Sequence, residues 1–328
     1  MRRAVLYILA AAVFLTGLGF LLYPNVERLA AGYRNREKIA AFQQEKKHRE
    51  EAGPDDGKAD SGYEELLRQM QEYNISIYEN GQKDLKDVWS YEQNPFDFRA
   101  AGLPDDMIGY ITIDAMDEEM PLYIGANEEN MKKGAVVMGQ TSMPVGGADT
   151  NCVIAAHRGY RGIPMFQYIE VLAPGDKVEI TNLWGTLEYE VVKSIVIYPD
   201  DIDAVKIVPG EDMLTLITCH PYTKNYQRYV VYCRRTDSPA QDAGSAENTE
   251  GEKKDISGAL ADRKGVEYES SAGDIRRERE LNTAALAVLT VIVAGAAVLH
   301  IHAGRKAGRG GRRKKRRCIK RRKTRGCK

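Results

Sequence analysis

Residues 213–235 read MLTLITCHPYTKNYQRYVVYCRR, two β-rich runs that flank a loop of turn-forming residues. The first run ends at Cys219 and the second begins at Arg228, which predicts a hairpin with these two residues opposite each other. Directly paired residues share one face of a sheet, with Cβ atoms about 5 Å apart. The sequence therefore places a guanidinium beside a thiol, where it can stabilise a thiolate or an oxyanion.

Similar β-rich runs, separated by turn residues, fill the chain from residue 107 onward. Eight strands at this density are typical of a compact barrel or sandwich, so the fold class is mainly β. The expected strands are Ile108–Ile113, Pro121–Ile124, Ala135–Met138, Cys152–Ala156, Lys177–Thr181, Thr186–Tyr198, Met213–Cys219 and Arg228–Arg234.

A histidine follows one of these strands directly, since His157 comes after Cys152–Ala156. Strand ends combine a rigid base with access to solvent, which suits a reactive pair. The alternation of side chains points His220 away from the face of Cys219. The remaining histidines lie outside the β domain, so His157 is the candidate partner base by elimination.

Each of these residues also has an ordinary structural explanation. A cysteine in an apolar strand is usually a small buried hydrophobe, and an arginine at a strand edge is usually solvated. We assign that structural role to Cys152 and Cys233, because Cys233 falls on the strand face opposite Arg228 and should not reach Cys219. No cysteine pair has metal-ligand spacing, so no metal or other cofactor is expected.

Charge is distributed unevenly along the chain, although the formal net charge is +0. Residues 303–328 are rich in Lys and Arg and contain no acid, which leaves the rest of the chain acidic. An acidic body argues against nucleic-acid binding, because phosphate recognition needs a cationic folded surface.

Two apolar stretches predict membrane anchoring. Residues 4–26 carry no charge and residues 281–301 contain only His300 as an ionisable group. Each is long enough to cross about 30 Å of hydrocarbon as a helix. A cleaved signal peptide is the alternative for the first stretch, but no small-residue cleavage site follows it. Basic residues at both chain ends predict two spans in the cell membrane, with both termini cytoplasmic and the β domain extracellular.

The expected organisation has seven parts. Residues 236–280 are rich in Ser, Ala, Gly, Asp and Glu, a composition that predicts a flexible linker. The parts are a transmembrane anchor at 1–26, a helical stalk at 27–80, a loop at 81–106, the β-barrel at 107–235, the linker at 236–280, a transmembrane helix at 281–302 and a basic tail at 303–328.

The residues Thr215-Leu216-Ile217-Thr218-Cys219 resemble the TLxTC signature of sortases, the membrane-bound cysteine transpeptidases of Gram-positive bacteria. Ala156-His157-Arg158-Gly159 is similar to the segment that carries the sortase histidine, and Arg228 falls where the family's arginine follows the cysteine strand. The resemblance covers residues 107–235 and implies an eight-stranded β-barrel. It also implies Cys219 as nucleophile, His157 as proton donor and acceptor, and Arg228 as the group that holds the substrate and the oxyanion.

Within this family the chain is most similar to class C, the pilin-polymerising sortases. The two spans, residues 139–147 and Pro221-Tyr222 all resemble that class. Asn94-Pro95-Phe96 resembles its lid motif, Asp-Pro-aromatic, in which the aromatic ring covers the cysteine and the acid pairs with the arginine. Asn94 departs from that aspartate, and His220 departs from the threonine common in class C.

The resemblance implies cleavage of LPxTG-type sorting signals between Thr and Gly, and transfer of the acyl group to an amine. The partners it implies are LPxTG-bearing pilins or surface proteins. For class C the acceptor is a pilin lysine; for a housekeeping sortase, the alternative, it is an amine of a cell-wall peptide. A wall-anchored or membrane-tethered binding protein is the non-enzyme alternative, but residues 267–280 contain no LPxTG-like sequence.

Overall fold

The computed structural model describes residues 2–52, 59–87, 92–236, 258, 260–293 and 295. The chain divides into two units, Leu22–Ile275 and Met1–Leu21 with Arg276–Lys328. The barrel lies in the first unit, as do most of the residues discussed below. The basic tail expected at 303–328 lies outside the described residues.

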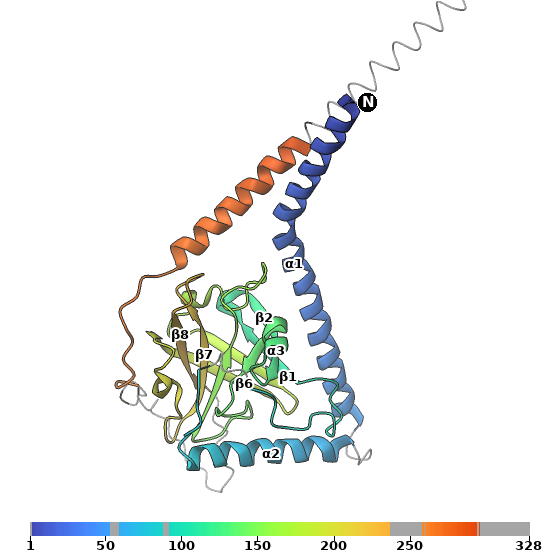
Figure 1. Cartoon of the computed structure of the whole chain (residues 1–328). Helices are drawn as coiled ribbons and strands as arrows, with labels where there is room; N and C mark the ends of the chain where they lie inside the picture. Colours follow the sequence, from blue (N-terminus) through green and yellow to red (C-terminus); the bar gives the residue numbers. More distant parts are fainter. Residues whose placement is uncertain are drawn as a thin grey trace, which may run out of the picture. The chain divides into compact units, whose positions relative to one another are not determined.

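Eight strands close into a barrel in the order β1-β2-β3-β4-β7-β8-β6-β5 (Figure 1). Every strand expected from the sequence is present, with ends that shift by at most a few residues, so the mainly β barrel is confirmed. The strands are β1 (Met107–Ile113), β2 (Glu118–Ile124), β3 (Ala135–Val137), β4 (Thr150–Ala155), β5 (Lys177–Asn182), β6 (Thr186–Ile197), β7 (Asp212–His220) and β8 (Gln227–Arg235).

Strand pairing around the barrel is mixed. β2 pairs with β3 and β4 pairs with β7 in parallel, whereas the other neighbours are antiparallel. Closure between β1 and β5 requires Gly109, because a Cβ atom there would lie 2.0 Å from the carbonyl oxygen of Thr181. The parallel pair β4–β7 brings the carboxyl ends of two strands to the same edge, which positions the site described below.

Apolar side chains cover both faces of the central strands. The inner face is filled by one cluster to which all eight strands contribute, and which includes Ile154, Leu216 and Val231. The outer face carries a second cluster, which includes Val153, Ile217 and Val230. Alternate residues of β4, β7 and β8 therefore face opposite sides, as the period of two requires.

Short and long helices surround the barrel. α2 (Ala59–Glu79) contributes Tyr63, Leu66 and Met70 to the inner cluster. The Asn74 side chain accepts from the backbone N–H of Met143 at 2.7 Å and donates to its carbonyl at 3.3 Å, which fixes α2 to the barrel. The shorter helices are α3 (Glu128–Lys133), η3 (Asp114–Met116), η4 (Ile169–Val171) and η5 (Ile202–Val205).

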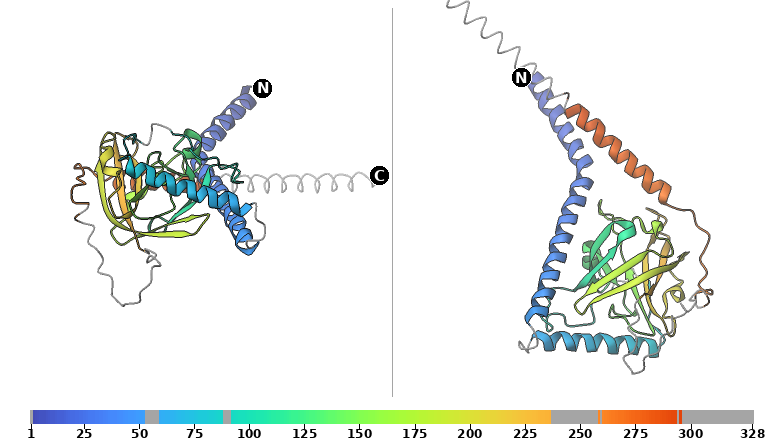
Figure 2. Two further views of the ribbon diagram at one scale, coloured as in Figure 1. Left: turned by 90° about the horizontal axis from the view of Figure 1, so that it is seen from below. Right: turned by 180° about the vertical axis from the view of Figure 1, so that it is seen from behind.

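The first helix, α1 (Arg2–Ala52), contains both the first apolar stretch and the start of the expected stalk. Its residues from 22 onward belong to the barrel unit and pack along it (Figure 2). Lys38 donates to the Tyr123 hydroxyl at 2.8 Å, and Lys46 donates to the Asn182 carbonyl at 3.0 Å. This part of the stalk is therefore a barrel-packing helix.

Residues 272–293 form a further helix, which includes the first part of the second apolar stretch. In the part of the chain that the structure describes, no helix combines the length and the apolar content needed to cross a membrane.

The segment after the barrel differs from the flexible linker expected at 236–280. Residues 237–257 lie outside the described residues, but residues 260–275 pack against the barrel, with Leu260 and Ile275 buried. The N–H of Val266 donates to the Val196 carbonyl at 2.8 Å. Composition pointed to a linker because apolar residues are few here, whereas backbone hydrogen bonds and a few apolar contacts hold the segment in place.

Candidate active site

His157 and Cys219 lie at the carboxyl ends of two neighbouring strands, β4 and β7. The two strands run parallel, and their last pair is Ala155 with Ile217. The contact continues one residue further, because the Ala156 N–H donates to the Ile217 carbonyl at 3.3 Å and the Thr218 hydroxyl donates to the Ala156 carbonyl at 2.7 Å. The next step in the same register sets His157 beside Cys219.

On the other side of β7, Cys219 pairs with Arg228 of β8. The register expected from the sequence is thus confirmed. Cys219 and Arg228 alternate with inner-face residues, so both project from the outer face. The strand order β4–β7–β8 sets Arg228 on one side of Cys219. Extension of the β4–β7 register by two residues puts position 157 on the other side, so that His157, Cys219 and Arg228 fall in one row. We call them the outer row.

Arg228 is held in one orientation by four hydrogen bonds. Its Nε and Nη2 donate to the two carboxylate oxygens of Asp87 at 3.1 and 2.8 Å. Its Nη1 donates to the carbonyls of Asn225 and Gln227 at 3.1 and 2.9 Å. Such a bidentate pair fixes the plane of a guanidinium as well as its charge. The carboxylate nearest the outer row is therefore Asp87, a residue that the sequence reasoning did not single out.

His157 is half-buried and stacks on Tyr160, with ring centroids 4.9 Å apart and planes 15° apart. Its carbonyl accepts from the Phe166 N–H at 3.0 Å, which fixes the start of the loop after β4. Burial, aided by the positive charge of Lys132, lowers the pKa of His157 below its ordinary value. A neutral imidazole can accept a proton and return it, as acyl transfer requires.

His220 points to the inner face, as the alternation predicted. Its ring is fully buried and lies near Tyr229 and Tyr268, with centroids 5.8 and 5.2 Å away. Its Nδ1 lies 2.5 Å from Arg158 Nη1. Burial and the neighbouring Arg158 charge lower the pKa of His220 to about 4. The ring is therefore neutral at pH 7 and accepts from the arginine.

Cys152 and Cys233 have the structural role expected of them. Both are buried in the inner cluster, where they remain thiols. Burial raises the pKa of each thiol well above its ordinary value. Because Cys219 lies on the outer face, the inner-face position of Cys233 keeps it away from Cys219, and neither buried thiol is suited to nucleophilic attack.

The structure places Asn94-Pro95-Phe96 differently from the expected lid. The Asn94 amide donates to Asp106 at 3.0 Å and its oxygen accepts from the Phe96 N–H at 2.9 Å. This turn sets the Phe96 ring edge-on to Tyr73, 5.7 Å away. The acid that pairs with Arg228 is Asp87, seven residues before Asn94, and residues 88–91 that follow Asp87 lie outside the described residues.

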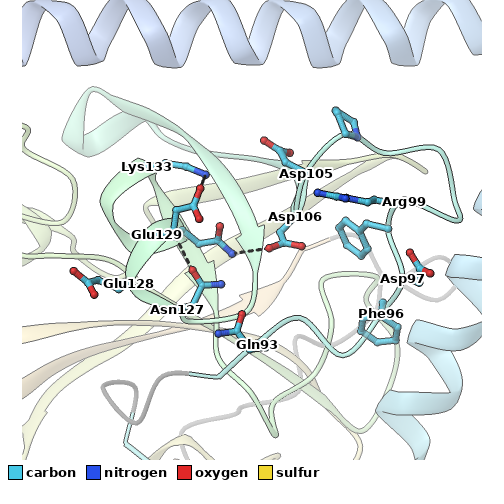
Figure 3. A pocket seen from close by; sticks show the side chains of 13 residues that line it. Gln93, Phe96, Asp97, Arg99, Asp105, Asp106, Asn127, Glu128, Glu129 and Lys133 are labelled. Atoms are coloured by element: carbon cyan, nitrogen blue, oxygen red, sulfur yellow. Dashed lines mark hydrogen bonds and ion pairs between the residues drawn. The ribbon is translucent and has the colours of Figure 1, made fainter.

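Phe96 also borders a polar hollow on a different part of the barrel unit (Figure 3). Asp106 lies in this hollow and accepts from the Asn130 side chain at 3.2 Å. Its carboxylate is thus engaged by amides rather than arranged with others as a metal site. Across the described ranges, no group of three or more His, Cys, Asp or Glu side chains is arranged to hold a metal ion.

Comparison with known proteins points to one family. Residues 111–236 match the model of the sortase domain. Sortase A of Bacillus anthracis is 30% identical over 125 residues, which cover 38% of this chain and 58% of that relative. The chain thus spans less than two thirds of the length of that curated relative.

Two solved structures resemble a larger part of the chain. Sortase C of Streptococcus pneumoniae is 30% identical, with a TM-score of 0.52 and coverage of 62% of this chain and 97% of that one. Sortase C1 of group B Streptococcus pilus island 1 is 30% identical, with a TM-score of 0.51 and coverage of 66% and 96%. Together with the barrel and the outer row, these matches show that the chain belongs to the sortase family of cysteine transpeptidases.

Proposed function

We propose that the chain cleaves LPxTG-type sorting signals between Thr and Gly and transfers the acyl group to an amine, with a pilin lysine as the acceptor. The observation that carries the proposal is the pairing of Cys219 with Arg228, supported by the parallel strand β4, which ends two residues before His157 beside the strand of Cys219. The pilin acceptor is supported by the likeness to sortase C structures, one of which comes from a pilus island.

In the first half-reaction, His157 takes the proton of the Cys219 thiol, and the resulting thiolate attacks the carbonyl carbon of the signal's threonine. Arg228 donates hydrogen bonds to the oxyanion or to the adjacent substrate backbone, a role for which its fixed plane is suited. The bond from that carbonyl carbon to the glycine nitrogen then breaks. His157 gives its proton to the departing amine, which leaves a thioester on Cys219.

In the second half-reaction, the acceptor amine attacks the thioester carbon. His157 takes the proton from the amine, and the sulfur leaves as a thiolate. An amide bond replaces the one that was cut, so no oxidant, metal or nucleotide enters the balance. Burial supports this cycle, because it keeps His157 neutral enough to accept the proton.

Substrate must displace Asp87 from Arg228 for the guanidinium to reach an oxyanion. Asp87 is only partly buried, with 27% of its side chain exposed against 5% for Arg228. Partly exposed ion pairs contribute little, about 1 kcal/mol or less, so this exchange is energetically accessible. We infer that Asp87 occupies the Arg228 guanidinium in the resting protein and that substrate binding displaces Asp87 from it.

We further propose that apolar helices at 1–26 and 281–302 anchor the protein in the cell membrane, with the barrel outside the cell and both termini in the cytoplasm. The support comes from the uncharged stretches and their basic flanks. Protease treatment of intact cells tests the orientation. Digestion of the barrel with protection of a tag at either terminus is the expected result, and protection of the barrel would contradict it.

One experiment tests the acyl transfer and the acceptor together. The full-length chain in detergent is incubated with an LPxTG peptide and, in separate reactions, a pilin-type lysine peptide or a cell-wall peptide amine. Mass spectrometry then identifies the joined product. Joining to the lysine peptide is expected. Preference for the cell-wall amine would favour wall anchoring, and the absence of any thioester or product would refute transpeptidation.

A further inference from the structure

The segment 260–271 crosses the barrel and reaches the end where the outer row lies. It covers part of β6, whose second half is paired only with β8 because β5 pairs with residues 186–190. Lys193 of β6 donates to the carbonyls of Leu260 and Arg263 at 2.7 and 2.9 Å. The Val266 N–H also donates to the Val196 carbonyl, so the segment lies along the second half of β6.

Two serines at the end of this segment, Ser270 and Ser271, form hydrogen bonds with the barrel. The Ser270 hydroxyl and the Ser271 N–H both donate to the carboxylate of Glu170, the latter at 3.1 Å to each oxygen. The Ser271 hydroxyl accepts from the N–H of Tyr222 at 2.9 Å. Tyr222 lies three residues after Cys219, so one buried serine connects this loop to Glu170.

Glu170 in turn belongs to a buried cluster with Arg158 and His220, which we call the inner clamp. Arg158 forms an ion pair with Glu170, lies 2.5 Å from His220 Nδ1 and donates to the Cys219 carbonyl at 3.4 Å. Burial alone would raise the pKa of Glu170, but hydrogen bonds from Ser270 and Arg158 hold it below its ordinary value. The clamp is therefore an ionised pair with a neutral histidine.

The inner clamp adjoins both reactive residues in sequence. Arg158 follows His157, and His220 follows Cys219. The β4–β7 backbone ladder pairs residues only as far as Ala155 and Ile217, so it stops short of the reactive pair. Beyond that point, the bonds of Arg158 to His220 and to the Cys219 carbonyl join the two strand ends. The bonds of Arg158, together with the Ala156 N–H and the Thr218 hydroxyl described above, therefore link the strand ends that carry His157 and Cys219.

We propose that Ser270 and Ser271 are positioning residues of the active site: they hold Glu170 and the loop after Cys219, and through the inner clamp they set the spacing of His157 and Cys219. This proposal rests on the proposed function. It gives the segment beyond the barrel a part in the reaction rather than the role of a tether. Small displacements of reacting groups are costly, because an error of about 1 Å can lower a rate about a hundredfold.

The test uses a double variant that carries both Ser270→Ala and Ser271→Ala. It is compared with the wild type, each as the full-length chain in detergent. The double variant removes the two hydroxyl bonds, Ser270 to Glu170 and Tyr222 N–H to Ser271, and keeps the bonds from the Ser271 N–H to Glu170. It should lower kcat for LPxTG peptide transfer by about tenfold to a hundredfold, because Glu170 and the loop after Cys219 are held less firmly. KM should change less than about twofold, because neither serine lies in the outer row. Ser270→Thr keeps the hydroxyl and Glu267→Gln alters an exposed residue of the same segment. Both should remain within about twofold of the wild type.

A second readout does not depend on transpeptidation. The pH at which Cys219 alkylates at half its maximal rate is measured by mass spectrometry of its peptide. The titratable and charged groups that surround Cys219 among the described residues include those of the outer row and Asp87 on one face, and Arg158, His220 and Glu170 of the inner clamp on the other. None of them is altered in the variant. Loss of their spacing should move the half-maximal pH upward by about one unit, towards that of an ordinary thiol.

The outcomes separate the two proposals. Wild-type kcat and an unchanged alkylation profile in the double variant would overturn the positioning role, as would a lowered melting temperature with kcat unchanged. If the wild type forms no thioester at all, the proposed function fails, whereas the alkylation profile still decides the positioning role. Ser270→Ala alone, at an exposed position, gives the same comparison if the double variant does not fold.

Discussion

The two faces of the strand ends carry different chemistry only one residue apart. His157 and Cys219 project from the outer face, while Arg158 and His220 project from the inner face and bind each other and Glu170. Inside, Arg158 and Glu170 form a buried ion pair, and buried charges are tolerated when they are paired. Outside, Arg228 pairs with Asp87, an acid whose side chain is 27% exposed and which the proposed mechanism replaces by substrate. Reactivity and rigidity are thus divided between two faces of the same strands.

Removing the outer thiol should have the largest effect. Cys219→Ala is expected to abolish thioester formation completely, since no other described thiol lies in the outer row. Cys152→Ala removes an inner-face thiol and should leave thioester formation intact. Intact-mass spectrometry after mixing with an LPxTG peptide checks both variants. Thioester formation in Cys219→Ala would show that a thiol other than Cys219 is the nucleophile.

Arg228→Ala should lower kcat by about 10²- to 10³-fold, the usual cost of losing one donor to an oxyanion. Arg228→Lys should recover only part of this loss, because an ammonium cannot reproduce the planar fork. Arg234→Ala, at the far end of β8, should change kcat less than about threefold. Steady-state kinetics on all three variants measure the effect, and near-normal turnover in Arg228→Ala would remove it from the mechanism.

The inner clamp should appear in the pH dependence of stability. The pKa of His220 is about 4 when folded, below its ordinary value of 6.5, so between these values the unfolded chain binds a proton that the folded chain does not. Stability is therefore full above pH 6.5 and falls as the pH drops. The loss should be about 1.4 kcal/mol per unit, or about 2 kcal/mol between pH 6.5 and pH 5.

Urea unfolding of the wild type and His220→Thr at these two pH values measures this loss. The variant should lose about 2 kcal/mol less than the wild type, because all other titrating groups are shared. The pKa of Glu170 is lowered from its ordinary value of 4.5, so its contribution to stability changes mainly below pH 4.5, outside the range from pH 5 to pH 6.5. Equal pH dependence in the two proteins would show that His220 is not held neutral.

A smaller effect is expected from Asp87. Asp87→Asn weakens the hold on Arg228 and should raise the rate of Cys219 alkylation and of acyl transfer about fivefold, in line with an ion pair of about 1 kcal/mol. Asp84→Asn alters an exposed acid of the same loop and serves as the matched control. Phe96→Ala should leave alkylation unchanged, because that ring packs on Tyr73. The reverse pattern would restore Phe96 as the lid residue.

Much of the fold could be predicted from the sequence. The eight strands followed from runs of β-forming residues between turns, and the pairing of Cys219 with Arg228 followed from the length of the loop between them. The inward direction of His220 followed from alternation alone. These features are local, because each depends on residues close together in the chain.

The missed features depend on distant residues. Asp87 meets Arg228 across 141 positions, and Ser271 meets Glu170 across 101. No spacing or period in the sequence encodes such contacts. The assignment of the lid to Asn94-Pro95-Phe96 rested on the proline and the aromatic ring, whereas the acid that binds Arg228 is followed by valine. The docking of residues 260–275 relies on hydrogen bonds between side chains and backbone groups far apart in the chain, such as those of Lys193 and Glu170, which composition does not reveal.

The most direct test of the central claim is to trap the intermediate on the wild-type chain. Rapid acid quenching after mixing with an LPxTG peptide, followed by proteolysis and mass spectrometry, identifies the acylated residue. The account predicts a thioester that joins the threonine carbonyl to Cys219 and disappears when a lysine amine is added. Acylation at any other residue, or product formation without acylated Cys219, would contradict it.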